Sequence, residues 1–171
     1  MAPEEHQWST AVSRRAMLRR IGAGTAVVWG VPVITSVKMP AYAATAGPGG
    51  CHLSGSLNAG QEVPPRDSSA TGAADMSVDT RTNVVRYTYS FNNLTGAATS
   101  AGLHQASVGE NGPVAITLAK PPRSGSGAVT GVIVVASVLA ADVCANPTNY
   151  YINISSTAFA EGEIRGQFAG T

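Results

Sequence analysis

Charged side chains are scarce in this sequence. They make up 12% of the 171 residues, which is low for a cytosolic protein, whereas the apolar fraction of 44% is ordinary for a folded β-rich domain. Five basic and two acidic residues precede Ala44, and six basic and eight acidic residues follow from there. The longer, C-terminal part is therefore mildly acidic and lacks the basic patch that a phosphate backbone requires, so we expect no nucleic-acid partner.

Cysteine is also rare. The two cysteines, Cys51 and Cys144, lie 93 positions apart and lack the paired spacing of a zinc site. In an exported protein the expected state is one disulfide between them, which would stabilise the fold by about 4 kcal/mol through loop closure. Two unpaired, buried thiols are the alternative.

Long apolar runs are missing as well. The most apolar stretch, Ile21–Val37, has 17 residues and is interrupted by Pro32 and by glycines. It is too short and too broken for a good membrane span.

The residues on either side of this stretch are those of an export signal. Arg14 and Arg15 precede it and Ala41-Tyr42-Ala43 follows it, which is the charged, apolar, A-x-A order of a secretory signal peptide. Paired arginines preceded by serine and followed by Met-Leu resemble the twin-arginine translocation signal. We predict that residues 1–43 are such a signal peptide, cleaved after Ala43, in a bacterial protein that is secreted or extracytoplasmic and has no stable membrane insertion after cleavage. A retained membrane anchor is the alternative.

Catalytic motifs are lacking too. The serines have no nucleophile-elbow sequence, and the chain has neither a phosphate loop nor a dinucleotide fingerprint. We therefore predict that the protein is not an enzyme and has no cofactor.

Short alternating segments separated by turn residues fill the chain after a Gly/Pro-rich linker at residues 44–50, which we expect to be disordered. Turns recur every 8–12 residues, and Ala136–Cys144 is better suited to a short helix. This pattern predicts an all-β fold, an antiparallel β-sandwich or flattened barrel with one short helix near residues 136–144. The expected strands are Cys51–Leu57, Ala70–Val78, Val84–Phe91, Ala101–Ser107, Val114–Leu118, Gly127–Val135, Tyr150–Ser155 and Glu163–Phe168.

Three of these strands carry specific expectations. In Val84–Phe91, the bulky residues at 85, 87, 89 and 91 share one face. Tyr150–Ser155 alternates in the manner of a half-buried strand, and the VIVV run within Gly127–Val135 is consistent with burial on both faces.

Four short sequences, in this order, make the chain recognisable. They are Leu57–Pro65 (LNAGQEVPP), Ala101–His104 (AGLH), Gly112–Val114 (GPV), and Tyr151–Ile154 (YINI) with Gly162–Gly166 (GEIRG). Together they resemble the CHRD domain, a module that is repeated in the developmental antagonist chordin and found singly in many secreted bacterial proteins. The resemblance covers about Cys51 to Phe168, so residues 51–171 are predicted to be a CHRD domain.

The resemblance implies a β-sandwich or barrel similar to the architecture of copper–zinc superoxide dismutase, but it does not by itself imply a catalytic activity. In chordin such domains belong to a protein that sequesters growth factors, which suggests a binding or structural role by analogy alone. The family usually has a second histidine in the motif that begins at Tyr151, and this chain has Ser155 there. If two histidines bind a metal in relatives, only His104 of that pair is kept.

His104 is the most suggestive side chain for a ligand site. Beside the Gly109–Pro113 turn, it could bind a metal together with a nearby carboxylate, and His52 is the other histidine of the predicted domain. No recognisable metal-ligand spacing links these residues, so we favour a structural role in which His104 is hydrogen-bonded to backbone between loops.

The remaining motif residues are expected to hold the domain together. Arg165 is predicted to form a charge-assisted contact with Glu62 or Glu163. This contact would tie the Asn58–Arg66 loop to the closing strand, which is the last predicted strand, Glu163–Phe168. The structural motif residues are Glu62, Pro64, Pro65, Asn153, Glu163 and Arg165.

Two functions fit these observations. The first is an exported single-domain CHRD protein that acts as an extracytoplasmic binding or structural module for an unknown protein or a cell-envelope ligand. The alternative is a metal-binding, possibly redox, protein on a dismutase-like scaffold, with a single metal ion near His104.

Overall fold

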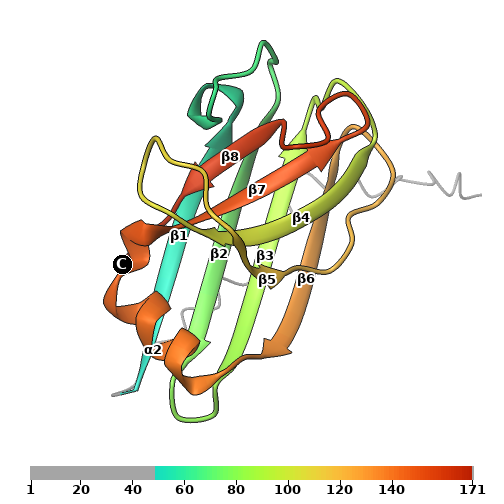
Figure 1. The fold of residues 1–171 in the computed structure, drawn as a ribbon. Coiled ribbons are helices and arrows are strands. Elements are labelled where there is room, and N and C mark those ends of the chain that lie inside the picture. Colours follow the sequence, from blue (N-terminus) through green and yellow to red (C-terminus); the bar gives the residue numbers. More distant parts are fainter. Residues whose placement is uncertain (1–48, 171) are drawn as a thin grey trace, which may run out of the picture. The chain divides into compact units, whose positions relative to one another are not determined.

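The computed structural model describes residues 49–170 (Figure 1). The predicted signal residues Arg14, Arg15, Ala41 and Ala43 lie outside the described residues, as do residues 44–48 of the predicted linker. The first strand already begins at Gly50, one residue inside that linker, because Gly50 pairs with Asp79.

Antiparallel strands make up most of the described chain. Their bounds agree with the predicted strands to within a few residues, and the largest difference is at the fourth, which begins at Ala98 rather than Ala101 and ends at Gln105 rather than Ser107. The strands are β1 (Gly50–Asn58), β2 (Thr71–Asp79), β3 (Val84–Asn92), β4 (Ala98–Gln105), β5 (Val114–Thr117), β6 (Gly127–Val134), β7 (Tyr150–Ser156), β8 (Ile164–Gln167) and β9 (Ala169–Gly170).

These strands form one curled sheet. Its order is β5-β4-β7-β8-β1-β2-β3-β6, with β9 paired to β1. In Figure 1, β1, β2, β3 and β6 run side by side, and β4, β7 and β8 cross in front of them. The described residues therefore form a curled half-barrel whose two halves face each other, which confirms the predicted all-β class with one short helix.

The apolar core lies between the two halves of the curled sheet. Every second side chain of β3 points into this core. As the sequence predicts, the buried ones are Val85, Tyr87, Tyr89 and Phe91. Leu103 of β4 is among the fully buried residues that meet them from the other half. Burying such side chains stabilises the fold by about 1.5–3 kcal/mol each.

The prediction that Tyr150–Ser155 is half-buried is wrong. Every residue of β7 is buried. One face of the strand packs in the apolar core through Ile152 and Ile154, and the other face is covered by loops that are described below.

The prediction that the VIVV run is buried on both faces is also wrong. β6 is an outer strand of the sheet, paired only with β3 among the described strands. Val132 and Val134 are 58% and 69% exposed, while Val129 and Ile133 pack against the core. Composition alone does not separate an outer strand from a central one.

The short helix α2 (Ser137–Ala145) lies where the sequence predicts it. Cys51 of β1 and Cys144 of α2 form the predicted disulfide, with a Cα–Cα distance of 5.4 Å. Tyr150 donates a hydrogen bond to Asp142 of the helix, so a side chain also joins α2 to the start of β7. The hydrogen bonds from Tyr150 and Asn146 lower the pKa of Asp142.

Candidate functional site

Polar and aromatic side chains from the recognisable sequences gather on one face of β4, β7 and β8. Strand register brings them together, since His104 is paired with Tyr151 and Asn153 is paired with Arg165. Residues two apart on a strand point to the same side, so Tyr151 and Asn153 share this face. It is opposite the face that packs in the apolar core, and we call it the polar face.

Two loops cover the polar face. The proline loop, residues 59–70, contains the short 3-10 helix η1 (Ala59–Gln61) and the exposed Pro64 and Pro65, and its Val63–Pro64 peptide bond is cis. The glycine loop, residues 106–113, follows β4. Asn111 Nδ2 donates a hydrogen bond of 2.7 Å to the Val63 carbonyl, so the two loops are also joined to each other.

Arg165 is the main tie to the glycine loop. Its side chain is 1% exposed, and it donates hydrogen bonds of 2.6 Å to the Glu110 carbonyl and 3.1 Å to the Ser107 carbonyl. The guanidinium also lies 3.4 Å from the centre of the Tyr151 ring, close enough for a cation–π contact. Burial lowers the pKa of Arg165, against the effects of Tyr151 and Glu62, but an arginine remains charged at any physiological pH.

Glu163 is the tie to the proline loop. Its Oε1 accepts hydrogen bonds of 2.7 Å from Ser68 Oγ and 2.6 Å from the Thr95 amide. Burial acts to raise the pKa of this carboxyl, but hydrogen bonds from Ser156, Ser68 and Thr95 outweigh burial and lower it. Glu163 is therefore a buried carboxylate that is held in its ionised form.

Among the described residues, no hydrogen bond or ion pair joins Arg165 to Glu62 or Glu163, so the predicted contact is not formed, although the charge of Arg165 does act on the Glu62 carboxyl. Among the described residues, the hydrogen-bond partners of Arg165 are two loop carbonyls and the Gln167 side chain. Arginine still ties a loop to the closing strand, but it is the glycine loop, and Glu163 ties the proline loop instead. Backbone carbonyls have no sequence signature, so no pattern in the chain points to them as partners.

Glu62 lies beneath the proline loop and is 4% exposed. Its Oε1 is buried and has no hydrogen-bond partner among the described residues. Burial raises the pKa of Glu62 to about 7, against the opposing charges of Arg165 and Arg66. It is therefore a carboxyl that titrates close to neutral pH inside the domain.

His104 has the backbone contact that a structural role requires. Its Nδ1 lies 3.0 Å from the Gly112 carbonyl, which can only accept, so Nδ1 carries the proton of this hydrogen bond. The imidazole also stacks on Tyr151, with ring centres 5.0 Å apart. The sequence predicts a backbone hydrogen bond for His104, and the structure shows one, which joins β4 to the glycine loop.

His52 lies elsewhere in the structure. It projects from β1, and its Nε2 is 4.0 Å from Asp75 Oδ1 on β2. Within residues 49–170, no three histidine, cysteine or acidic side chains gather in a way that would hold a metal ion. The structure therefore does not combine His52, His104 and a carboxylate into one such group.

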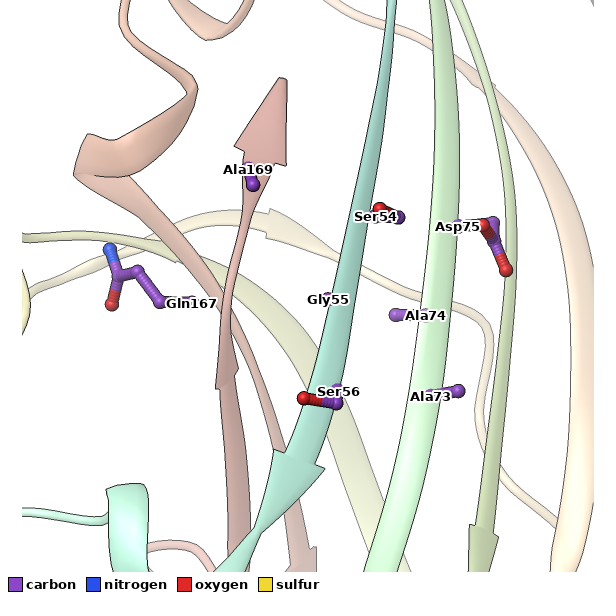
Figure 2. A pocket seen from close by; sticks show the side chains of 8 residues that line it. All are labelled: Ser54, Gly55, Ser56, Ala73, Ala74, Asp75, Gln167 and Ala169. Carbon is purple, nitrogen blue, oxygen red and sulfur yellow. The ribbon is translucent and has the colours of Figure 1, made fainter. Parts of the chain in front are cut away.

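A shallow depression beside β1 is the other candidate site (Figure 2). In Figure 2, the side chains along β1 and β2 here are small, and Gln167 points away from β1. The only charged side chain that lines the depression is Asp75, so it offers a ligand little beyond backbone and hydroxyl groups. The lining residues are Ser54, Gly55, Ser56, Ala73, Ala74, Asp75, Gln167 and Ala169.

Two glutamines that sequence reasoning missed complete the polar face. Gln61 donates to the Ser56 carbonyl at 2.8 Å and accepts from the Gln167 amide at 3.1 Å, so its side chain bridges β1 and β8. Gln167 Nε2 donates to the carbonyls of Ala106 and Thr148. The signal that could have found Gln61 is its position directly before Glu62 in a recognisable sequence.

In the described residues, no helix is long and apolar enough to cross a membrane. A search of curated proteins finds no match to this chain, and a search of solved structures finds none either. The predicted likeness to the dismutase architecture therefore stays a prediction.

The family comparison does give a match. The model of the CHRD domain matches residues 53–168, which is more than half of the chain and includes every residue of the polar face discussed above. The chain therefore belongs to the CHRD domain family.

Proposed function

We propose that this chain is an extracytoplasmic binding or structural module, exported by the twin-arginine route, whose ligand is a protein or a component of the cell envelope. The observation that carries the proposal is the joining of the two loops over the polar face. Arg165 and Glu163 fix the glycine loop and the proline loop from below, and Asn111 joins the loops to each other. Loops held on a rigid scaffold are a common place for binding surfaces.

The outer surface of the two loops presents both apolar and acidic side chains to a binding partner. Pro64 and Pro65 of the proline loop are exposed, and Val108 of the glycine loop is 76% exposed. Asp67 and Glu110 add exposed acidic groups beside them. Apolar side chains with a polar rim, on loops that lose little entropy on binding, are typical of protein-recognition surfaces.

Binding to isolated cell envelopes of the producing organism tests this surface. We expect saturable binding of the purified protein, and we expect the double substitution Val108→Asp/Pro65→Glu to weaken it at least tenfold. Thr82→Asp, an exposed change in the β2–β3 turn, is the matched control and leaves binding unchanged. Equal binding by the loop variant and the control would place the function elsewhere on the molecule.

Export is tested separately by mass. Native mass spectrometry of the protein recovered outside the cell is expected to show a chain that begins at Ala44, and reductant is expected to add two hydrogens. Changing Arg14 and Arg15 to lysines is expected to keep the protein in the cytoplasm. An extracellular protein that still carries residues 1–43 would contradict the cleavage.

Metal binding at His104 is the second candidate function. Because Nδ1 donates to Gly112, the neutral ring has its free lone pair on Nε2, the atom that would bind a metal. The same mass measurement decides between the candidates. One bound metal ion that is lost in His104→Ala would make this a metal-binding protein, and a metal-free mass would favour the binding module.

A further inference from the structure

Four buried polar atoms of the polar face and its proline loop lack hydrogen-bond partners among the described residues: Glu62 Oε1, Asn153 Oδ1, Glu163 Oε2 and Arg66 Nε. Two of them, Glu62 Oε1 from the proline loop and Asn153 Oδ1 from β7, lie against the same glycine. Glu62 is 4% exposed and Asn153 is 7% exposed. Leaving a buried polar atom unpaired costs about 1–3 kcal/mol, so two such atoms in one place indicate that a hydrogen-bonding partner is missing.

Gly162 shows that the two atoms converge. A Cβ atom built on Gly162 would lie 2.5 Å from both Asn153 Nδ2 and Asn153 Oδ1, and 2.7 Å from Glu62 Oε1. Asn153 Nδ2 donates to the Glu161 carbonyl at 3.3 Å, which leaves the two oxygen atoms as acceptors without a donor. Both acceptors therefore approach the same side of one glycine, in the space that a side chain would need. An ionised Glu62 beside this acceptor oxygen has no proton to share with it.

The charges around Glu62 make a metal cation a poor occupant. Arg165 on β8 and Arg66 on the proline loop are the positive charges that act on the Glu62 carboxyl. A metal ion between Glu62 and Asn153 would be repelled by both guanidinium groups, and the close packing against Gly162 leaves little room for it. A proton is the one cation that fits.

The other titratable groups of the polar face have partners of their own. Directly before β8, Glu163 Oε1 accepts from Ser68 and Thr95. Glu163 Oε2 is unpartnered among the described residues, but the hydrogen bonds to this carboxyl lower its pKa, so it stays ionised. On β4 and β7, His104 and Tyr151 are engaged with Gly112 of the glycine loop. Glu62 is thus the group on this face that is left to take up a proton.

We propose that Glu62 is a proton-operated latch for the proline loop. In the acid form, the Glu62 hydroxyl donates a hydrogen bond to Asn153 Oδ1. This bond gives both buried oxygen atoms a partner and holds the loop against β7. When the proton leaves to solvent, two acceptors face each other in a buried site, and the loop is released so that the carboxylate can be hydrated. The closed form is favoured most below neutral pH, and the population of the open form increases above it.

The size of the effect follows from the two ionisation states. Burial raises the pKa of Glu62 in the closed form to about 7, whereas the ordinary value of 4.5 applies once the loop is open. Proton linkage then predicts that the opening equilibrium of the loop increases about thirtyfold between pH 5.5 and pH 8.5.

Hydrogen exchange of the proline-loop amides measures this opening directly. In the purified protein with its disulfide intact, we expect protection of the hydrogen-bonded amides of Gln61, Glu62 and Arg66, corrected for intrinsic exchange, to fall about thirtyfold over that pH range. Glu62→Gln keeps a donor for Asn153 but cannot ionise, so its protection should be independent of pH. Glu161→Gln, which removes an exposed carboxylate next to Gly162, is the matched control and should behave like the unmodified protein.

A pH-independent profile in the unmodified protein would overturn the latch, as would an unchanged pH dependence in Glu62→Gln. Should Glu62→Gln fail to fold, the carbon-13 shift of the Glu62 carboxyl in the unmodified protein gives a second measurement. A titration midpoint near 7 supports the latch, and a midpoint near 4.5 contradicts it.

Discussion

At the scale of single residues, Gly162 is where the polar face is packed most closely. Its φ of +135° is a conformation that side-chain-bearing residues rarely adopt, and the missing side chain makes room for Glu62 and Asn153. Arg165 is the other residue on which this face depends, because it is a fully buried charge whose hydrogen bonds go to loop carbonyls.

Gly162→Ala should be strongly destabilising, because it combines backbone strain with contacts under 3 Å to Asn153 and Glu62. We expect a loss of about 2–4 kcal/mol in the free energy of unfolding, measured in urea. Gly109→Ala separates the two causes, since Gly109 also has a positive φ but would meet nothing within 4 Å. It should cost about 1 kcal/mol. Equal losses in the two variants would show that close packing at Gly162 contributes nothing.

Arg165→Lys should be destabilising although it keeps the charge. A lysine lacks the planar fork that reaches Glu110 and Ser107 and the flat surface that stacks on Tyr151. We expect a loss of about 2–4 kcal/mol in the free energy of unfolding, with faster hydrogen exchange in the glycine loop. The exposed Arg86 gives the reference: Arg86→Lys should change stability by less than about 0.5 kcal/mol.

At the scale of secondary-structure elements, β6 lies at one edge of the sheet, and few residues of the helix α2 are buried. β6 is an outer strand of eight residues with no charge, no proline and a regular register along β3. Such an edge offers unpaired backbone groups to other chains. α2 is held by the disulfide and by Asp142, since only Ala140 and Val143 of the helix are buried.

A lysine on β6 should suppress aggregation. Val132 is 58% exposed, so Val132→Lys adds a charge at the edge at little cost to the fold. We expect slower growth of light scattering on heating, with a change in unfolding free energy within about 0.5 kcal/mol. Thr82→Lys adds the same charge in the β2–β3 turn and should leave aggregation nearly unchanged. If both variants aggregate equally slowly, net charge and not the strand edge is responsible.

Removing the disulfide should loosen α2 and destabilise the domain. Cys51 and Cys144 close a loop with a sequence separation of 93, for which chain entropy predicts about 4 kcal/mol. Replacing both cysteines by serine should lower the free energy of unfolding by about 2–4 kcal/mol, and reductant should have no further effect on that variant. A stability equal to that of the unmodified protein would mean that the cross-link does not constrain the unfolded chain.

At the scale of the whole molecule, buried ionisable groups set how stability depends on pH. Glu163 is ionised in the folded state, and its pKa is lower there than in the unfolded chain. Its contribution is therefore present above the unfolded value of about 4.5 and is lost as the pH falls through the folded value. Glu62 has the opposite effect on the free energy of unfolding. Because its pKa is raised in the folded state, its contribution is present at acidic pH and is lost as the pH rises through about 7.

The free energy of unfolding should therefore decrease on acidification below about pH 4.5. Glu163→Gln should make this decrease smaller. It should also lower the free energy of unfolding at pH 6, because the amide cannot replace the carboxylate equally well as the acceptor for Ser68 and Thr95. Urea unfolding at several pH values measures both effects. The exposed Asp67 serves for comparison, since Asp67→Asn should show the same decrease in the free energy of unfolding at acidic pH as the unmodified protein.

The sequence by itself determined the fold class, the core face of β3 and the helix near residue 140, and with two cysteines it allowed a single disulfide pairing. Each of these depends on local periodicity or on a count of residue types, and both are visible in the chain. It also identified the residues of the polar face, because they lie in the sequences that resemble the CHRD domain, to which the chain belongs.

Only the tertiary structure decided what these residues contact. Whether Val132 is exposed depends on which strand lies at the edge of the sheet, and strand order is a long-range property. Arg165 binds carbonyls of a loop more than fifty positions away, and backbone groups of that kind occur at every residue. The burial of Glu62 next to Asn153 likewise arises because a loop folds back over β7, which no local pattern in either segment encodes.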